Sequence, residues 1–107
     1  MRLFGLFNVK DINEGMQEYR AAGGAVLLDV RTREEYAAGH IEGSRCLPLQ
    51  EIEKAEELVR DKGTPLFVHC QSGARSARAA EMLKRMGYTG VRDIGGITGY
   101  NGKVVTE

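Results

Sequence analysis

Short apolar runs alternate with amphipathic segments along this chain, and the alternation constrains its fold more than any other feature. The clearest runs are residues 25–30 and 66–70, each entered through glycine or proline. Runs of this kind are typical of strands that are buried on both faces of a sheet. Weaker runs at residues 45–47 and 90–94 predict two more strands, and residues 3–7 are expected to add an edge strand.

Helical periodicity fills the segments between these runs. Apolar side chains recur every three or four positions in residues 11–21, 50–60 and 76–86, and Thr32 is placed to cap a shorter helix over residues 33–38. The apolar face expected of the second helix comprises Ile52, Ala55, Leu58 and Val59. Strands that alternate with helices predict an α/β fold, with a mostly parallel sheet and helices on both faces. A chain of 107 residues is expected to form one domain, residues 1–107.

Charge and cysteine content exclude several classes of function. Fifteen basic residues balance fifteen acidic ones, so we expect neither a nucleic-acid partner nor a membrane partner, since both need a concentrated positive field. No apolar run approaches the roughly 18 residues of a membrane span. The apolar start, residues 1–8, is short and lacks a small-residue cleavage site, so no export signal is expected. Cys46 and Cys70 show no metal-binding spacing, which predicts no metal site and a reducing, cytoplasmic location.

The turn after residues 66–70 carries the pattern of a nucleophilic site. Ligands of such sheets bind beyond the carboxyl ends of the strands, and Cys70 stands at such an end with a helix soon after it. Its sulfur therefore faces unpaired N–H groups and the positive end of a helix dipole, which favour the thiolate. Gly73 allows successive N–H groups to point inward, Arg75 adds a permanent positive charge, and Ser76 adds a hydroxyl.

A cysteine at a strand end is often only a small buried residue, but the rest of this turn favours chemistry. A glycine, an arginine and a following helix suit a nucleophile whose attacked group carries negative charge, such as sulfane sulfur, phosphate or arsenate. His69, just before the cysteine, has the chemistry of a general base. Because neighbouring strand residues point to opposite sides, we expect His69 to be a core histidine on a sheet face instead.

Several signatures follow one another in a recognisable order. They are Asp29-Val30-Arg31, Glu35-Tyr36, Gly39-His40-Ile41-Glu42-Gly43, Leu47-Pro48-Leu49, the loop from Cys70 to Ser76, Gly87-Tyr88 and Gly95-Gly96-Ile97. In this order the chain resembles the rhodanese-like domain in its short single-domain form. The resemblance implies a five-stranded, mainly parallel sheet flanked by helices on both faces. It also implies a sulfurtransferase of the thiosulfate:cyanide class, with no cofactor.

The resemblance assigns roles to individual residues. Cys70 is the catalytic residue that accepts sulfur as a persulfide, and the loop amides hold that sulfur. The loop residues expected to bind it are Gln71, Ser72, Gly73, Ala74, Arg75 and Ser76. Asp29, Arg31 and Glu35 are expected to support the loop, with a carboxylate of this segment, preferably that of Glu35, holding Arg75. The implied partners are a small-molecule or protein-bound sulfur donor and a thiol or cyanide acceptor.

Two departures from the family pattern bear on function. Cys46 stands where the family usually has asparagine, and it is either a buried core residue or a second thiol near the first. The two-domain thiosulfate enzymes of the family have a basic residue in place of Ser72 and an arginine in place of Glu35. This difference argues against efficient use of thiosulfate.

Three other functions remain as alternatives. A Cys-dependent phosphatase or arsenate reductase of the same fold also uses a Cys-to-Arg loop, but a longer one with an acid for the leaving group. Here four residues separate Cys70 from Arg75. This shorter loop predicts a binding site with room for one sulfur atom beyond the cysteine sulfur. A non-catalytic binding module of this fold usually lacks the cysteine. A purely redox role lacks a neighbouring resolving cysteine.

Overall fold

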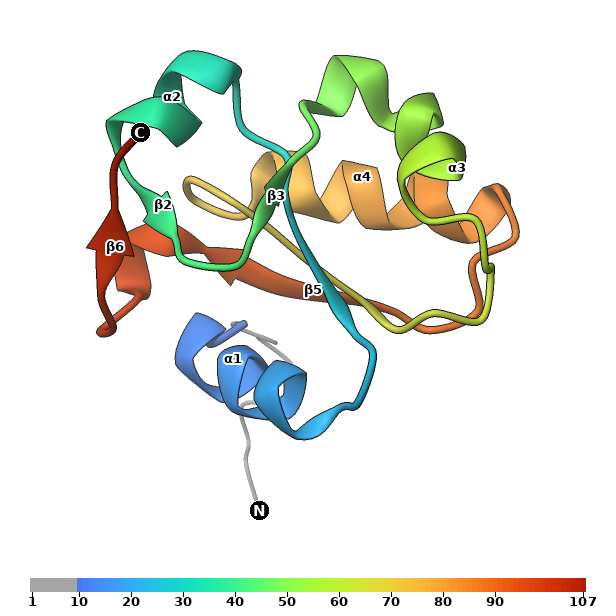
Figure 1. Cartoon of the computed structure of the whole chain (residues 1–107), viewed down its shortest axis with the longest axis horizontal. Helices are drawn as coiled ribbons and strands as arrows, with labels where there is room; N and C mark the ends of the chain where they lie inside the picture. The colour runs from blue at the N-terminus through green and yellow to red at the C-terminus, as the bar shows by residue number, and fades with distance from the viewer. Residues whose placement is uncertain (1–9) are drawn as a thin grey trace.

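A parallel sheet of four strands forms the centre of the molecule (Figure 1). The computed structural model describes residues 10–107. In spatial order the strands are β3 (Arg45–Cys46), β1 (Val26–Asp29), β4 (Leu66–Cys70) and β5 (Val91–Gly96), and every neighbouring pair is parallel. The two strongest apolar runs thus occupy the two middle positions, and the predicted α/β class is confirmed. The edge strand predicted over residues 3–7 lies outside the described residues.

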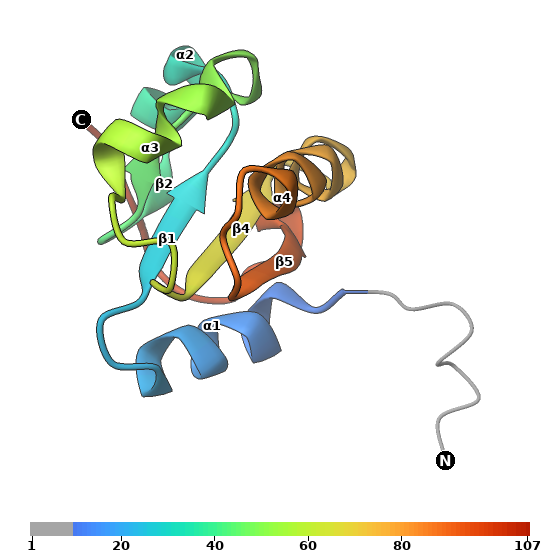
Figure 2. The same ribbon diagram turned by 90° about the vertical axis from the view of Figure 1, so that its right-hand side faces the viewer.

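Helices cover both faces of this sheet (Figure 2). α1 (Ile12–Ala21) packs on one face, while η2 (Leu49–Lys54), α3 (Ala55–Leu58) and α4 (Ala74–Arg85) cover the other. Leu27 and Phe67 belong to the α1 cluster, whereas their neighbours Leu28 and Val68 belong to the opposite one. Side chains alternate between faces along a strand, so burial on both sides requires a continuous apolar run. Each fully buried large side chain contributes about 1.5–3 kcal/mol.

Side-chain caps fix where two of the helices begin. The Asp11 carboxylate accepts from the Asn13 N–H at 2.9 Å and starts α1. Thr32 and Glu35 form a reciprocal capping box at the start of α2 (Arg33–Ala38), which follows β1. Because Glu35 is held by this box, its side chain leaves α2 in a defined direction. The predicted start of α2 after the Thr32 cap is confirmed, and α1 begins one residue after its predicted start.

The helix predicted over residues 50–60 is broken into two parts. It begins as the 3-10 segment η2, and Glu51 has non-helical angles of φ −114° and ψ 21°. A 3-10 turn holds fewer residues than an α-turn, so the apolar face does not continue in register from η2 into α3. Ile52, Ala55 and Val59 are buried as expected, but Leu58 is 37% exposed and its predicted burial is wrong.

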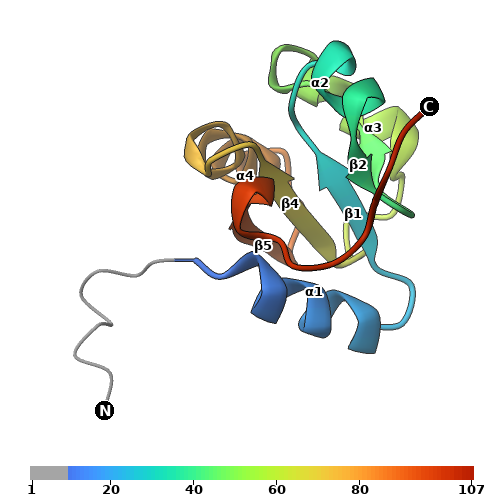
Figure 3. The same cartoon turned by 90° about the vertical axis from the view of Figure 1, so that its left-hand side faces the viewer.

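Two differences lie near the predicted functional turn. α4 begins at Ala74, two residues before the predicted start, because Gly73 takes a left-handed conformation and turns the chain abruptly. Arg75 and Ser76 therefore lie in the first turn of α4. The second difference is a ribbon that we did not predict, in which β2 (His40–Ile41) pairs antiparallel with β6 (Val104–Val105) (Figure 1). Figure 3 shows the C-terminal segment running beside β2. Strands of two residues are too short to show a periodicity.

Candidate active site around Cys70

The Cys70 sulfur lies inside a tight turn at the carboxyl end of β4. The residue is 1% exposed, and the chain passes through Gln71 and Ser72 to Gly73, where φ is 110°. This angle favours glycine, and it turns the Gly73 N–H back toward Cys70, where it donates to Sγ at 3.0 Å. α4 starts at the next residue. The sulfur thus meets a backbone donor and a helix N-terminus, which both stabilise a negative charge on it.

Ser76 connects the sulfur to β5. Its buried hydroxyl oxygen lies 3.6 Å from Cys70 Sγ and donates to Asp93 Oδ1 at 2.8 Å. The same carboxylate oxygen accepts from the Gly95 N–H at 3.0 Å. While the Ser76 proton points to Asp93, its oxygen can accept a hydrogen bond from the Cys70 thiol. Ser76 is therefore a polar contact of the sulfur, and the Asp93 carboxylate is the nearest acceptor of its proton.

The end of β5 supports the loop from behind. Gly96 pairs with Cys70 in the parallel register, and a Cβ on Gly96 would lie only 2.6 Å from the Ser72 Cα. The Thr98 N–H and hydroxyl both donate to the Gln71 carbonyl at 3.2 Å. Glycine is needed at position 96 because the loop backbone occupies the space of a side chain. Any larger residue would displace the loop.

Arg75 is paired with Glu35 as predicted. Its two terminal nitrogens donate to the two carboxylate oxygens at 2.7 Å and 3.0 Å, and each side chain is 33% exposed. The same carboxylate accepts from the Thr32 N–H at 2.8 Å. Hydrogen bonds from Arg75, followed by those from Thr32, lower the pKa of Glu35 to about 2. Glu35 therefore remains charged at neutral pH and joins the start of α2 to the start of α4.

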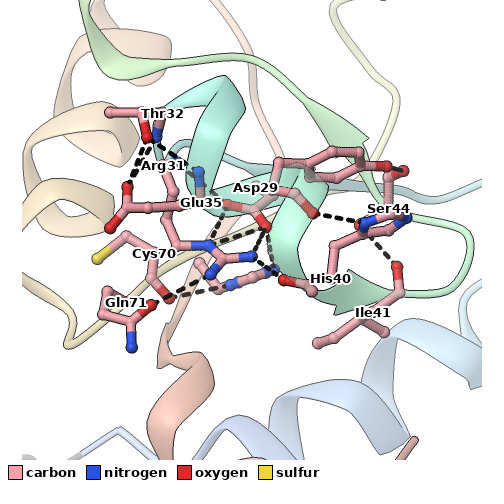
Figure 4. A network of polar contacts seen from close by, with 12 residues as sticks. Asp29, Arg31, Thr32, Glu35, His40, Ile41, Ser44, Cys70 and Gln71 are labelled. Atoms are coloured by element: carbon pink, nitrogen blue, oxygen red, sulfur yellow. Dashed lines mark hydrogen bonds and ion pairs between the residues drawn. The ribbon is translucent and has the colours of Figure 1, made fainter. Parts of the chain in front are cut away.

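Asp29 and Arg31 support the loop through Gln71, whereas Glu35 supports it through Arg75 (Figure 4). Both side chains are buried. The Arg31 guanidinium donates hydrogen bonds to both carboxylate oxygens of Asp29, and the shortest of them is 2.8 Å. Arg31 also donates to the Gln71 side chain at 3.1 Å and to the Gly39 carbonyl at 2.7 Å. Asp29 thus orients Arg31, and Arg31 contacts the first residue after the cysteine. All three predicted supporting residues lie around the loop, but only Glu35 contacts Arg75.

His69 is a core residue, as expected. It is fully buried, with Nδ1 3.1 Å from the Cys70 carbonyl oxygen and Nε2 3.7 Å from Asp29 Oδ2. Nε2 has no hydrogen-bond partner among the described residues. Burial lowers the pKa of the imidazole, partly opposed by the Asp29 carboxylate. Its ring contacts the backbone of Cys70 and not the sulfur.

Cys46 matches neither sequence interpretation. It is half-buried at the edge of the sheet, so it is not a core residue. It pairs with Asp29, which pairs with His69, and β1 therefore separates it from β4. Two strand spacings amount to about 10 Å, beyond the Cα separation of a disulfide. Cys46 is not placed to resolve a disulfide or persulfide on Cys70.

Sequence reasoning missed Asp93 and Thr98 as parts of the site. An acidic residue within the apolar run of β5 was the available signal for Asp93, whereas nothing local distinguishes Thr98. Asp93 also borders a hollow of about 340 Å³ beside the loop, which Lys10 and Ser72 line from other sides. Between residues 10 and 107 there is no group of three His, Cys, Asp or Glu side chains suited to a metal, and no helix long and apolar enough to cross a membrane. The site offers one thiol, backbone donors and paired charges.

Comparisons with known proteins agree with this arrangement. Residues 10–103 match the family model described as the rhodanese-like domain. The chain is 39% identical to thiosulfate sulfurtransferase PspE of Escherichia coli (strain K12), over 65% of this chain and 68% of that protein. It is 36% identical to the human thiosulfate:glutathione sulfurtransferase, over 71% and 77% respectively. A solved structure described as a rhodanese with anions from E. coli matches with a TM-score of 0.73 and 34% identity, over 78% of this chain and 99% of that one.

Proposed function

This chain belongs to the rhodanese-like domain family and is homologous to sulfurtransferases, and on that premise we propose that it transfers sulfur through a persulfide on Cys70. The sulfur comes from a sulfane donor, which is thiosulfate or a persulfide, and passes to a thiol or to cyanide. The observation that carries the proposal is the Gly73 N–H, which donates to Cys70 Sγ at 3.0 Å. No cofactor takes part.

In the first step, the Cys70 thiolate attacks the outer sulfur of the donor. A new S–S bond forms to Cys70 as the S–S bond within the donor breaks, and its electron pair leaves with sulfite or a thiolate. The outer sulfur remains on Cys70 as a persulfide. In the second step, an acceptor thiolate or cyanide attacks that outer sulfur and returns the electron pair to Cys70. No net oxidant or reductant is needed, because each S–S bond that breaks is replaced by a new bond to the transferred sulfur, an S–S bond with a thiol or an S–C bond with cyanide.

The loop stabilises the charge that moves during these steps. The N–H groups in the first turn of α4 have no intrahelical acceptor, so those of Ala74, Arg75 and Ser76 are available to the outer sulfur. Preorganised N–H donors of this kind lower the activation barrier most when they point at the atom on which negative charge develops in the transition state. Contacts from Thr98, just after β5, to Gln71 and the ion pair to Arg75 keep the donors in place. The ion pair of Arg75 with Glu35 anchors the same helix start.

The size of the turn favours sulfur over phosphate as the transferred group. Only four residues separate Cys70 from Arg75, and the Gly73 N–H is already directed at the cysteine sulfur itself. A phosphoryl group needs room for three oxygens around its phosphorus, whereas a persulfide adds one atom. We therefore propose sulfur transfer and no phosphatase activity.

The two enzymatic functions can be separated by one set of assays. Wild type and Cys70→Ser are given thiosulfate or cysteine persulfide with cyanide, and separately an aryl phosphate. Sulfur transfer by the wild type alone, with equal background phosphate release from both proteins, is the expected result. Cys70-dependent phosphate release with no sulfur transfer from either donor would support the phosphatase instead.

The partners and location follow from this chemistry. A small-molecule or protein-bound persulfide supplies the sulfur, and a thiol accepts it, without nucleic acid or membrane. We propose a cytoplasmic location, because reducing conditions keep a free thiol from forming disulfides between cycles.

A further inference from the structure

The arginine of the loop is already neutralised in the structure. Both terminal nitrogens of Arg75 are directed at Glu35, at 2.7 Å and 3.0 Å, in a two-point contact that leaves neither carboxylate oxygen unmatched. Two-point contacts between arginine and carboxylate are among the strongest charge-assisted hydrogen bonds. An anionic substrate must compete with Glu35 for this guanidinium. Arg75 therefore supplies little net positive charge to the donor.

The arginines on the neighbouring β1–α2 segment are neutralised too. Arg31 is buried against Asp29, and Arg33 makes a two-point contact with Glu51 at 2.5 Å and 2.9 Å. The loop itself adds no further charge. Its other residues are Gln71, Ser72, Gly73, Ala74 and Ser76. Lys10 borders the hollow beside Ser72, but the Asp93 carboxylate borders the same hollow.

Sulfane donors differ in the charge that such a site must accept. Thiosulfate brings two negative charges and leaves as a sulfite dianion, whereas an alkyl persulfide brings at most one on its reacting sulfurs. The helix start supplies only about half an elementary charge. The arginines of this site are paired, and its helix start supplies about half a positive charge. Such a site balances the charge of a singly charged persulfide better than that of the thiosulfate dianion.

We propose that this site prefers an alkyl persulfide to thiosulfate, and that Glu35 sets the preference by neutralising Arg75. The inference rests on the proposed sulfur transfer and names its donor class. With a persulfide R–S–SH, the Cys70 thiolate takes the outer sulfur, the S–S bond of the donor breaks, and R–S⁻ leaves. The products are Cys70–S–SH and the thiolate, so atoms, protons and electrons balance.

The test compares the two donors in one protein preparation. The ratio of kcat/KM for thiosulfate to that for cysteine persulfide is measured in wild type and in Glu35→Gln. Glutamine keeps an oxygen for the Thr32 N–H and removes the charge that balances Arg75. Freeing one positive charge beside a dianion is expected to raise the ratio about tenfold at low salt, and less at high salt because salt screens the attraction. The ratio is independent of the folded fraction, so partial misfolding does not affect it.

Two further variants isolate the charge balance. Glu34→Gln removes the same charge from an exposed neighbour that does not contact Arg75, and it should leave the ratio within about twofold. The double variant Glu35→Gln/Arg75→Gln restores neutrality and should lose the gain. If Glu35→Gln does not fold, Ser72→Lys adds a charge at an exposed loop position and should raise the ratio instead.

Each outcome has a defined meaning. A raised ratio in Glu35→Gln alone supports the proposal. An unchanged or lowered ratio in Glu35→Gln, an equal rise in Glu34→Gln, or a wild type that prefers thiosulfate overturns it while leaving sulfur transfer intact. Absence of Cys70-dependent transfer from both donors would overturn the proposed function itself.

Discussion

The two cysteines occupy similar places in the sheet, yet the chain leaves them in different ways. Each is the last residue of a parallel strand, β3 for Cys46 and β4 for Cys70, and a helical segment follows each. After Cys46 the chain stays extended beside β1, and the Leu47 and Leu49 N–H groups donate to carbonyls of Asp29 and Val30. After Cys70 the chain turns at once, and the Gly73 N–H donates to the sulfur.

The helical segments differ as well. Neither segment has a side-chain cap, but η2 is distorted at Glu51, whereas α4 runs for 12 regular residues from the turn. Burial raises the pKa of the Cys46 thiol, and the nearby Asp29 carboxylate raises it further. A strand end followed by a helix is therefore not enough to direct backbone donors at a thiol. A glycine turn that directs backbone donors at the sulfur makes the difference.

The largest effect is expected from removing that turn. Gly73→Ala forces a side chain into φ 110°, which should cost about 1–2 kcal/mol of stability or else rotate the N–H away from Cys70. Loss of one preorganised backbone donor should lower kcat/KM for sulfur transfer about a hundredfold. Steady-state kinetics and urea unfolding measure the two effects.

The matched control for this variant is Gly23→Ala. Gly23 precedes β1, and a Cβ there would meet no atom within 4 Å. Activity and stability should both stay close to those of the wild type. If Gly73→Ala were as active as Gly23→Ala, the glycine turn would not distinguish Cys70 from Cys46.

A second comparison concerns how acid affects one ion pair in each region, Glu35 with Arg75 and Glu51 with Arg33. The pKa of both Glu35 and Glu51 is lowered to about 2, chiefly by hydrogen bonds from Arg75 and Arg33 respectively. A carboxyl with a depressed pKa in the folded state contributes stability above its unfolded value near 4.5, and this contribution disappears as pH falls through about 2. Glu35 joins two helix starts, whereas the Arg33–Glu51 pair lies at the surface.

We therefore expect Glu35→Gln to destabilise the protein by about 1 kcal/mol at pH 7, a value reduced from the full pKa shift because solvent screens a partly exposed pair. Glu51→Gln should have a smaller effect. The penalty of Glu35→Gln should fade between pH 4.5 and about 2, as followed by urea unfolding at a series of pH values. A penalty that is independent of pH would assign Glu35 a packing role without electrostatic stabilisation.

The smallest effect is expected at Cys46. Cys46→Ser changes a half-buried thiol that makes no contact with the Cys70 loop, so kcat/KM should stay within about twofold and stability within about 0.5 kcal/mol. The same assays measure both quantities. A tenfold loss of activity would show that Cys46 takes part in the reaction after all.

The sequence predicted what depends on local pattern. The apolar runs of β1 and β4, the cap at Thr32 and the loop after Cys70 are each encoded in a few neighbouring residues. The pairing of Arg75 with Glu35 was also predicted, because the resemblance placed α2 beside the loop. These features define the sheet centre and most of the site.

The remaining features depend on contacts between distant residues. The hydrogen bond from Ser76 to Asp93 and the support of Gln71 by Thr98 exist only because β5 lies beside β4. The contact of Arg31 with Gln71 spans 40 positions in the chain. The exposure of Leu58 follows from a break at Glu51 that apolar spacing does not reveal. Apart from the acidic residue within the apolar run of β5, none of these has a signature within a short window.

Mass spectrometry tests most directly whether Cys70, and not Cys46, carries the sulfur. The wild type, Cys46→Ser and Cys70→Ser are each incubated with cysteine persulfide, and the excess donor is removed. The mass of each intact protein is then measured, and each protein is digested for peptide mapping. The wild type and Cys46→Ser should each gain about 32 Da, located on the peptide that contains Cys70 and removed by cyanide. Cys70→Ser should gain nothing. An adduct that persists in Cys70→Ser, or that maps to Cys46 in the wild type, would contradict the assignment of the sulfur to Cys70.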